Sequence, residues 1–109
     1  GKDWARPYVF IDDVVDAVRL AVDAPNSTIT SDAYNISGGI WPTIDEIRGI
    51  IADVSGFRKI TLQNGRTPTD YLIGPLSIEA ASRDLRYVPS YDLKRGIKVY
   101  YGWLQKHQF

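Results

Sequence analysis

The first strong pattern in the sequence is an apolar run whose period changes. Residues 8–11, Tyr-Val-Phe-Ile, are aromatic and β-branched, as is typical of a short strand. The acids Asp12 and Asp13 follow, and they suit the N-terminal end of a helix. Apolar residues then recur at steps that place them on one helical face: Val14, Ala17, Val18, Ala21 and Val22. Because Pro25 and Asn26 end this pattern, we expect a strand that turns directly into a buried helix.

Two further stretches have the composition of strands. Residues 33–37 are short and alternate, so Tyr34 and Ile36 would share one face. Residues 59–62, Lys-Ile-Thr-Leu, form a plausible third strand. The pattern therefore predicts three short strands.

Three helices are expected after the first one. Thr43 and Glu46 have the spacing of a capping box, and Gly56 would stop the helix that they begin. Gly49 lies inside this helix and costs about 1 kcal/mol relative to alanine, so we expect it to pack closely against a neighbour. A short helix is predicted from Ser77 through Leu85. The last helix is expected to begin near Asp92.

The elements together predict the α/β class. We expect one small mixed α/β domain, residues 1–109, with about three short strands and four helices. The chain carries 13 basic and 13 acidic residues, so no net field attracts nucleic acid or an anionic membrane. It has no cysteine, which excludes disulfides and thiolate metal sites. No apolar run approaches the roughly 20 residues that a membrane span needs.

Four blocks of the sequence resemble, in the same order, motifs of one enzyme family. The blocks are residues 6–14, RPYVFIDDV; residues 34–39, YNISGG; residues 41–47, WPTIDEI; and residues 93–97, LKRGI. They are similar to the motifs R-D-F/Y-V-Y/H-V-D-D-V, Y-N-I-G-G-G, x-x-T-I-x-E-I and L-x-x-G-I of the NAD-dependent epimerase/dehydratase family. These are extended short-chain dehydrogenases that act on nucleotide sugars, and the resemblance covers nearly the whole chain.

The resemblance implies that two parts of a longer cytoplasmic enzyme have different roles. The chain has no Gly-x-Gly-x-x-Gly turn and no Tyr-x-x-x-Lys pair, so it would lack the Rossmann cofactor half. NAD would bind to a missing N-terminal domain, and no cofactor is expected in this chain. Residues 1–109 would be the C-terminal substrate-binding domain, which holds the nucleotide sugar and is inactive alone.

The resemblance also implies the residues that bind the substrate. Arg6 heads the first block, and Arg66 lies in the stretch Arg-Thr-Pro-Thr-Asp that ends at Asp70. This stretch is similar to the family's R-x-G-D loop, whose arginine clamps the substrate diphosphate, although here the spacing is one residue longer. The planar fork of arginine makes paired, charge-assisted bonds to phosphate oxygens. We expect Arg6 and Arg66 to face one concave surface.

Several residues have a structural interpretation beside a functional one. Adjacent carboxylates point apart, so Asp12 and Asp13 are interpreted as helix-start residues rather than as a catalytic pair. Trp4 either covers the edge of the core or stacks on a base. Residues 77–81, SIEAA, lack the lysine of the family's D-x-S-K-A motif, which leaves the sugar and the nucleotide open. The sequence offers no partner residue for His107, so it supports neither catalysis nor metal binding there.

Two expectations concern partners. Aromatic residues outside the helical stripes would form an apolar seam toward a cofactor domain: Trp4, Tyr8, Phe10 and Trp41. Left open to water, such a seam favours a symmetric homodimer. The alternative hypotheses are a non-catalytic binding or interaction module derived from the same fold, and a fragment without ligand affinity.

Overall fold

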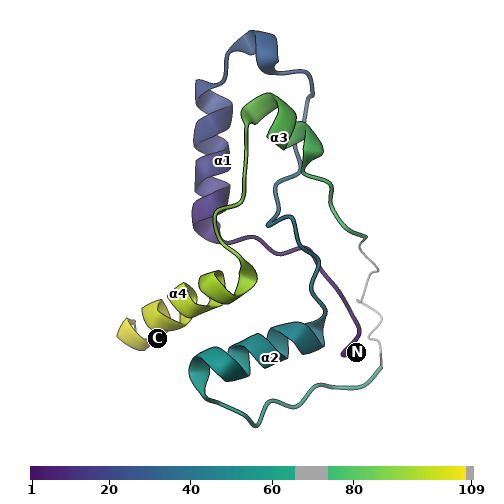
Figure 1. Cartoon of the computed structure of the whole chain (residues 1–109), viewed down its shortest axis with the longest axis vertical. Helices are drawn as coiled ribbons and strands as arrows, with labels where there is room; N and C mark the ends of the chain where they lie inside the picture. The colour runs from purple at the N-terminus through teal and green to yellow at the C-terminus, as the bar shows by residue number, and fades with distance from the viewer. Residues whose placement is uncertain (66–73, 108–109) are drawn as a thin grey trace.

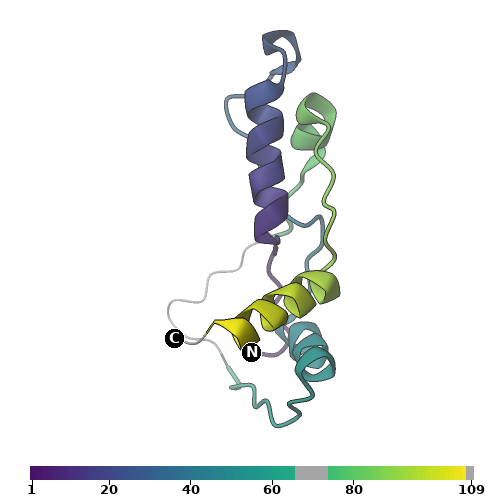
Figure 2. The same cartoon turned by 90° about the vertical axis from the view of Figure 1, so that its left-hand side faces the viewer.

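The computed structural model describes residues 1–65 and 74–107, which contain four α-helices and one 3₁₀ turn (Figure 1). The elements are α1 (Ile11–Asp23), η1 (Asn26–Thr28), α2 (Ile44–Ser55), α3 (Glu79–Leu85) and α4 (Leu93–Lys106). Helix α1 packs against α3 at one end of the molecule, and α2 packs against α4 at the other (Figures 1 and 2). None of these helices is long and apolar enough to span a membrane.

The predicted three-stranded α/β domain is wrong for the part of the chain that the structure describes. Residues 33–37 and 59–62 belong to no strand, and Ile11 begins α1 instead of ending a strand. One isolated antiparallel bridge joins Ala5 to Thr43 in these residues. A strand needs a neighbouring backbone about 4.8 Å away along its length. Aromatic and β-branched composition indicates a half-buried, extended segment. It does not indicate that a second backbone segment lies alongside.

Residues 4–10 nevertheless connect two of the other sequence blocks through single backbone contacts. The carbonyl of Trp4 accepts the N–H of Ile44 at 2.6 Å, and the N–H of Arg6 donates to the carbonyl of Pro42 at 3.2 Å. The N–H of Gly38 donates to the carbonyl of Tyr8 at 2.6 Å. A Cβ at position 38 would lie 2.6 Å from the same Tyr8 oxygen, so only glycine permits this approach.

The end of the same segment anchors the C-terminal block. The ring of Phe10 packs on Gly96 of α4, where a Cβ would lie 3.1 Å from Phe10 Cδ2, and its centroid is 4.4 Å from that of Tyr91. The buried carboxylate of Asp13 accepts the backbone N–H groups of Ser90 and Tyr91 at 2.9 and 3.1 Å. The first block thus touches all three of the others, which explains why residues far apart in sequence form one unit.

The predicted helix boundaries after α1 are largely confirmed. Thr43 Oγ1 accepts the N–H of Glu46 at 3.1 Å, while Glu46 Oε2 accepts that of Thr43 at 2.7 Å. Gly56 ends α2 in the left-handed conformation, with φ 74°. Asp92 caps α4 by accepting the N–H of Arg95. The expected close packing of Gly49 is wrong, because a Cβ there would meet nothing within 4 Å.

The core is small and lies between α1, α3 and the extended segments. Four buried apolar residues form its cluster, and Tyr34 and Ile36 pack against them: Ala17, Ala81, Leu85 and Tyr87. The prediction that α1 is a buried helix is half wrong. Ala17 is buried, but Val18 and Val22 expose 59% and 77% of their surface. The radius of gyration is 16.4 Å, compared with about 13 Å for a compact domain of this length.

Candidate functional site

The half-buried Arg6 lies at a hollow beside the start of α2. Its backbone is held by the bond to Pro42 and by the adjacent Ala5–Thr43 bridge. Its guanidinium carbon lies 5.2 Å from the centroid of the Trp4 ring, a cation–π contact that orients the side chain. The backbone that carries Arg6, the predicted substrate-binding cation, is therefore held in place.

Two adjoining hollows lie at this site, and Arg6 lines the smaller of them. The first has a volume of about 160 Å³ and is lined by six residues: Gly1, Trp4, Arg6, Ile44, Leu62 and Gln63. The second has a volume of about 560 Å³ and shares Gly1 and Trp4 with the first, but it extends to Trp41, Thr43 and Gly65. Trp41 is 42% exposed and offers an apolar aromatic surface there.

Arg6, rather than the N-terminus of α2, is the group at this site that can hold an anion. The first N–H groups of α2 already have partners within the chain. Ile44 donates to the carbonyl of Trp4, Asp45 to that of Lys2 and Glu46 to the hydroxyl of Thr43. A phosphate would have to displace these bonds to use the helix dipole, whereas the arginine fork is charged and half-exposed.

The other two predicted substrate-binding residues, Arg66 and Asp70, lie outside the described residues. Gly65 immediately precedes Arg66 in the sequence and lines the larger hollow. Its carbonyl accepts a hydrogen bond from the backbone nitrogen of Gly1 at 2.9 Å. The expectation that Arg6 and Arg66 share one concave surface remains a prediction.

A separate apolar pocket of about 440 Å³ lies between residues 8–11 and α4. Its lining is mainly aromatic and aliphatic: Tyr8, Phe10, Ile11, Tyr91, Ile97 and Tyr100. This surface can accept apolar groups but gives a diphosphate no cationic partner. Of the four aromatics of the expected seam, Trp41 is exposed, and Trp4, Tyr8 and Phe10 are half-buried.

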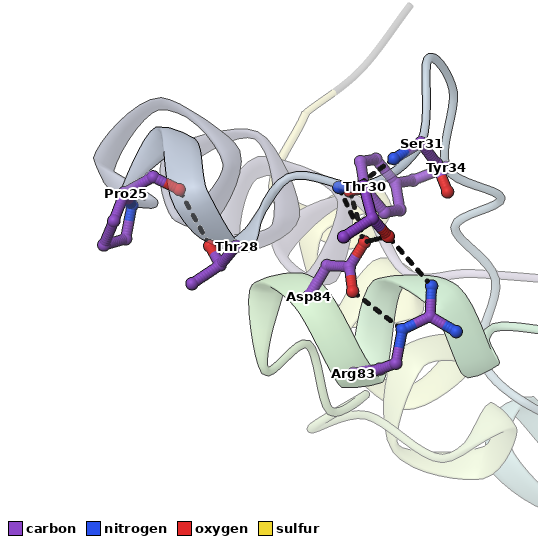
Figure 3. Close-up of polar contacts among 7 residues, drawn as sticks. All are labelled: Pro25, Thr28, Thr30, Ser31, Tyr34, Arg83 and Asp84. Carbon is purple, nitrogen blue, oxygen red and sulfur yellow. Dashed lines mark hydrogen bonds and ion pairs between the residues drawn. The ribbon is translucent and has the colours of Figure 1, made fainter.

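A polar cluster centred on the buried Asp84 joins α3 to the segment after η1 (Figure 3). Thr30 donates its backbone N–H at 3.1 Å and its hydroxyl at 2.6 Å to Asp84 Oδ2. The hydroxyl of Tyr34 donates to the same oxygen at 2.7 Å, and Arg83 Nε donates to Oδ1 at 2.8 Å. Apart from the bond of the neighbouring Arg83, these bonds join residues 50 and 54 positions apart. They therefore fix the segment after η1 on α3.

The hydrogen bonds from Arg83, Thr30 and Tyr34 hold the pKa of Asp84 well below its usual range. Both carboxylate oxygens accept donors from the chain, so the cluster is an anchor and not a place for a ligand. No pattern in the sequence predicts this cluster. The residue types are ordinary for loops and helix ends, and only the folded chain brings them together.

The two acids at the start of α1 are structural, but not as helix caps. Asp13 holds the backbone at Ser90 and Tyr91, and Asp12 accepts the hydroxyl of Tyr91 at 3.2 Å. The N-cap of α1 is Phe10, which makes no side-chain capping bond. Among the described residues, no group of three or more His, Cys, Asp or Glu side chains could hold a metal ion.

The buried Tyr87 links the core to the second sequence block. Its hydroxyl donates to the carbonyl of Ser37 at 2.8 Å. Burial raises the pKa of Tyr87, and the negative charges of Asp13 and Asp16 add to this effect. Tyr87 therefore remains a neutral donor and has a structural role.

Comparison with solved structures shows which proteins have this fold. The UDP-glucose 4-epimerase of Thermotoga maritima, solved with UDP-glucose, matches 96% of the chain with a TM-score of 0.83 and 24% identity. The L-threonine dehydrogenase of Phytophthora infestans matches 97% with a TM-score of 0.83 and 21% identity. The UDP-glucuronic acid 4-epimerase of Bacillus cereus, in complex with NAD, matches 96% with a TM-score of 0.71 and 22% identity.

The matched part is only 33%, 35% and 32% of those three chains, so this chain spans about one third of their length. No family model and no curated protein matches the sequence. Two of the three structures are epimerases, which confirms at the level of fold the resemblance to the NAD-dependent epimerase/dehydratase enzymes. The 109 residues therefore have the fold of about one third of the chain of these epimerases and this dehydrogenase.

Proposed function

We propose that this chain is the nucleotide-sugar-binding part of an NAD-dependent sugar epimerase or dehydratase. One observation carries the proposal: Arg6 lies at a hollow next to Trp4, within a fold shared with a UDP-glucose 4-epimerase solved with UDP-glucose. The guanidinium of Arg6 would bind the substrate diphosphate. In this proposal NAD is held by an N-terminal domain outside the 109 residues, and that domain would supply the hydride chemistry.

The contribution of this chain is to orient the substrate. A diphosphate held by Arg6 is fixed relative to the backbone, because bonds to Pro42 and the Ala5–Thr43 bridge hold the arginine's main chain. The exposed ring of Trp41 supports the proposal, since it offers the base or the sugar an apolar surface in the adjoining hollow. Arg66 and Asp70 are proposed as further contacts to the same substrate. Such positioning can supply a large part of a barrier reduction.

Calorimetric titration of the chain with UDP-glucose tests this proposal. We expect Arg6→Ala to weaken binding by about 1.5–3 kcal/mol, the range for a hydrogen bond to a charged group. Arg58→Ala removes the same charge from an exposed position after α2 and serves as the matched control. Equal affinities for the Arg6 and Arg58 variants, or no binding of UDP-glucose by the parent chain, would contradict the assignment.

A second candidate substrate class is favoured by one comparison. The L-threonine dehydrogenase matches the fold with the same TM-score as the UDP-glucose 4-epimerase. The hollow beside Arg6 could then hold the carboxylate of an amino acid. Titration with L-threonine in place of UDP-glucose separates the two classes, because an amino-acid site should bind L-threonine without needing a diphosphate.

A further inference from the structure

One asparagine of the chain stands immediately before a glycine at the rim of the two hollows near Arg6. Asn64 lies between Gln63 and Gly65 in the sequence. Gln63 lines the smaller hollow with Arg6, and Gly65 lines the larger one. Asn64 is exposed, and the segment that leads to it, residues 57–65, runs outside the four helices (Figure 1). A chemical change of the Asn64 side chain would therefore alter the edge of both hollows.

The backbone at this position leaves room for an attack on the Asn64 side chain by the next residue. Gly65 has no side chain, and a Cβ at its position would meet nothing within 4 Å among the described residues. Its φ is 91°, a positive value that glycine adopts freely. Within residues 1–65 and 74–107, no hydrogen bond ties the Asn64 amide or the Gly65 N–H to another group. The backbone nitrogen of Gly65 can therefore approach Cγ of Asn64.

We propose that Asn64 is a site of spontaneous deamidation and that its conversion weakens the substrate site. The nitrogen of Gly65 attacks Cγ of Asn64 and forms an N–Cγ bond. The bond from Cγ to Nδ2 breaks, and Nδ2 leaves as ammonia with the proton that the Gly65 nitrogen gives up. Water then opens the cyclic imide at either carbonyl, which yields aspartate or isoaspartate. Both products carry a carboxylate where a neutral amide stood, and the step needs no oxidant or reductant.

The other two asparagines lack these features and serve as internal controls. Asn26 precedes Ser27 but lies in the 3₁₀ turn η1, where its carbonyl accepts a backbone N–H at 3.3 Å. The turn fixes its backbone in a helical conformation, which holds the next nitrogen away from the side-chain carbonyl. Asn35 precedes Ile36, whose branched Cβ crowds its own nitrogen and whose side chain packs against the core. Among the three asparagines of the chain, we therefore expect Asn64 to react first.

The new carboxylate would act against a diphosphate bound by Arg6, an effect that rests on the proposed function. The chain carries 13 basic and 13 acidic residues, so conversion adds one negative charge to a neutral chain. This charge repels the diphosphate and attracts the guanidinium of Arg6. Because Asn64 is exposed, water and salt screen both effects. We expect the affinity for UDP-glucose to fall by roughly three- to tenfold.

Incubation of the folded chain at mildly alkaline pH, followed by peptide mass spectrometry, tests the chemistry. We expect the mass shift of an amide-to-acid conversion at Asn64, while Asn26 and Asn35 keep their amides. The conversion should become faster as the pH rises, because the attacking nitrogen must lose its proton. Far-UV circular dichroism monitors that the helices stay folded during the incubation. Loss of the Asn64 amide no faster than that of Asn35, or a rate independent of pH, would overturn the proposal.

Two variants test the effect on binding without waiting for the reaction. Asn64→Asp places the product carboxylate directly. Asn64→Gln keeps a neutral amide, but its longer side chain would have to close a larger ring and therefore reacts slowly. In calorimetric titration with UDP-glucose, the Asn64→Asp chain should bind roughly three- to tenfold more weakly than the parent. The Asn64→Gln chain should bind like the parent and keep its affinity through the incubation that weakens the parent.

The two measurements separate this inference from the proposed function. Equal affinities of the Asn64→Asp and Asn64→Gln chains would overturn the effect on the site. A parent chain that binds no UDP-glucose would overturn the proposed function and the effect on binding together. Mass spectrometry decides the deamidation itself without any ligand, so a stable Asn64 amide leaves the proposed function unaffected.

Discussion

Replacing Gly38 by alanine probes the contact that holds the first two sequence blocks together. The added Cβ would lie 2.6 Å from the carbonyl oxygen of Tyr8. An ordinary contact needs about 3.4 Å, so the two segments must separate by about 0.8 Å. The neighbour is backbone and cannot rotate away. The same movement stretches the 2.6 Å hydrogen bond from the N–H of Gly38 to that oxygen.

The expected cost follows from these two effects. Overpacking of a tight contact costs typically about 1–3 kcal/mol, and the weakened hydrogen bond adds about 1 kcal/mol. A domain of this length has a total stability of about 5–15 kcal/mol, so a loss of about 2–4 kcal/mol is a large fraction. Urea unfolding followed by tryptophan fluorescence should show a midpoint shifted to lower urea with an unchanged slope. A Gly38→Ala chain within about 0.5 kcal/mol of the parent would refute the argument.

Two further stability changes follow from the structure. Gly49→Ala should raise the free energy of unfolding by about 1 kcal/mol, since the new methyl group meets open space in α2 and alanine favours helix; a decrease in the urea midpoint would show a hidden close contact. The pKa of Asp84 is lower in the folded than in the unfolded chain, so its contribution is fully present above about pH 4 and is lost as the pH falls further. Asp84→Asn should lower stability at neutral pH and flatten the acid side of the stability curve, whereas Asp53→Asn, at an exposed position on α2, should leave that curve shaped like the parent's.

Elements fixed by local chemistry could be predicted from the sequence. The capping box of Thr43 and Glu46 needs only residues three apart, and Gly56 stops α2 because it adopts a left-handed conformation that other residues resist. Asp92 caps α4 for the same local reason. Arg6 lines a hollow beside the start of α2, while its role in binding a substrate together with Arg66 stays a prediction.

Features that depend on distant segments could not be predicted. Strand composition in residues 33–37 does not say whether a second backbone lies alongside, and here none forms a ladder. The periodicity of α1 predicts an apolar face but not which face packs on the rest of the chain, so it predicts a buried position for Val18, which is exposed. The Asp84 cluster joins α3 to Thr30 and Tyr34, which lie 54 and 50 positions away from Asp84, and no local pattern reports contacts over such separations.

The central claim is that the hollow beside Arg6 binds the diphosphate of a nucleotide sugar, and the three tryptophans of the chain provide a direct test. Trp4 and Trp41 line the hollows at this site, while Trp103 lies on α4 and lines neither. The indole N–H signals of ¹⁵N-labelled chain can be followed by NMR as UDP-glucose is added. We predict that the Trp4 and Trp41 signals move and saturate together while that of Trp103 stays in place, and that Arg6→Ala removes the response. Movement of the Trp103 signal alone, or an unchanged response in the Arg6→Ala chain, would contradict the claim.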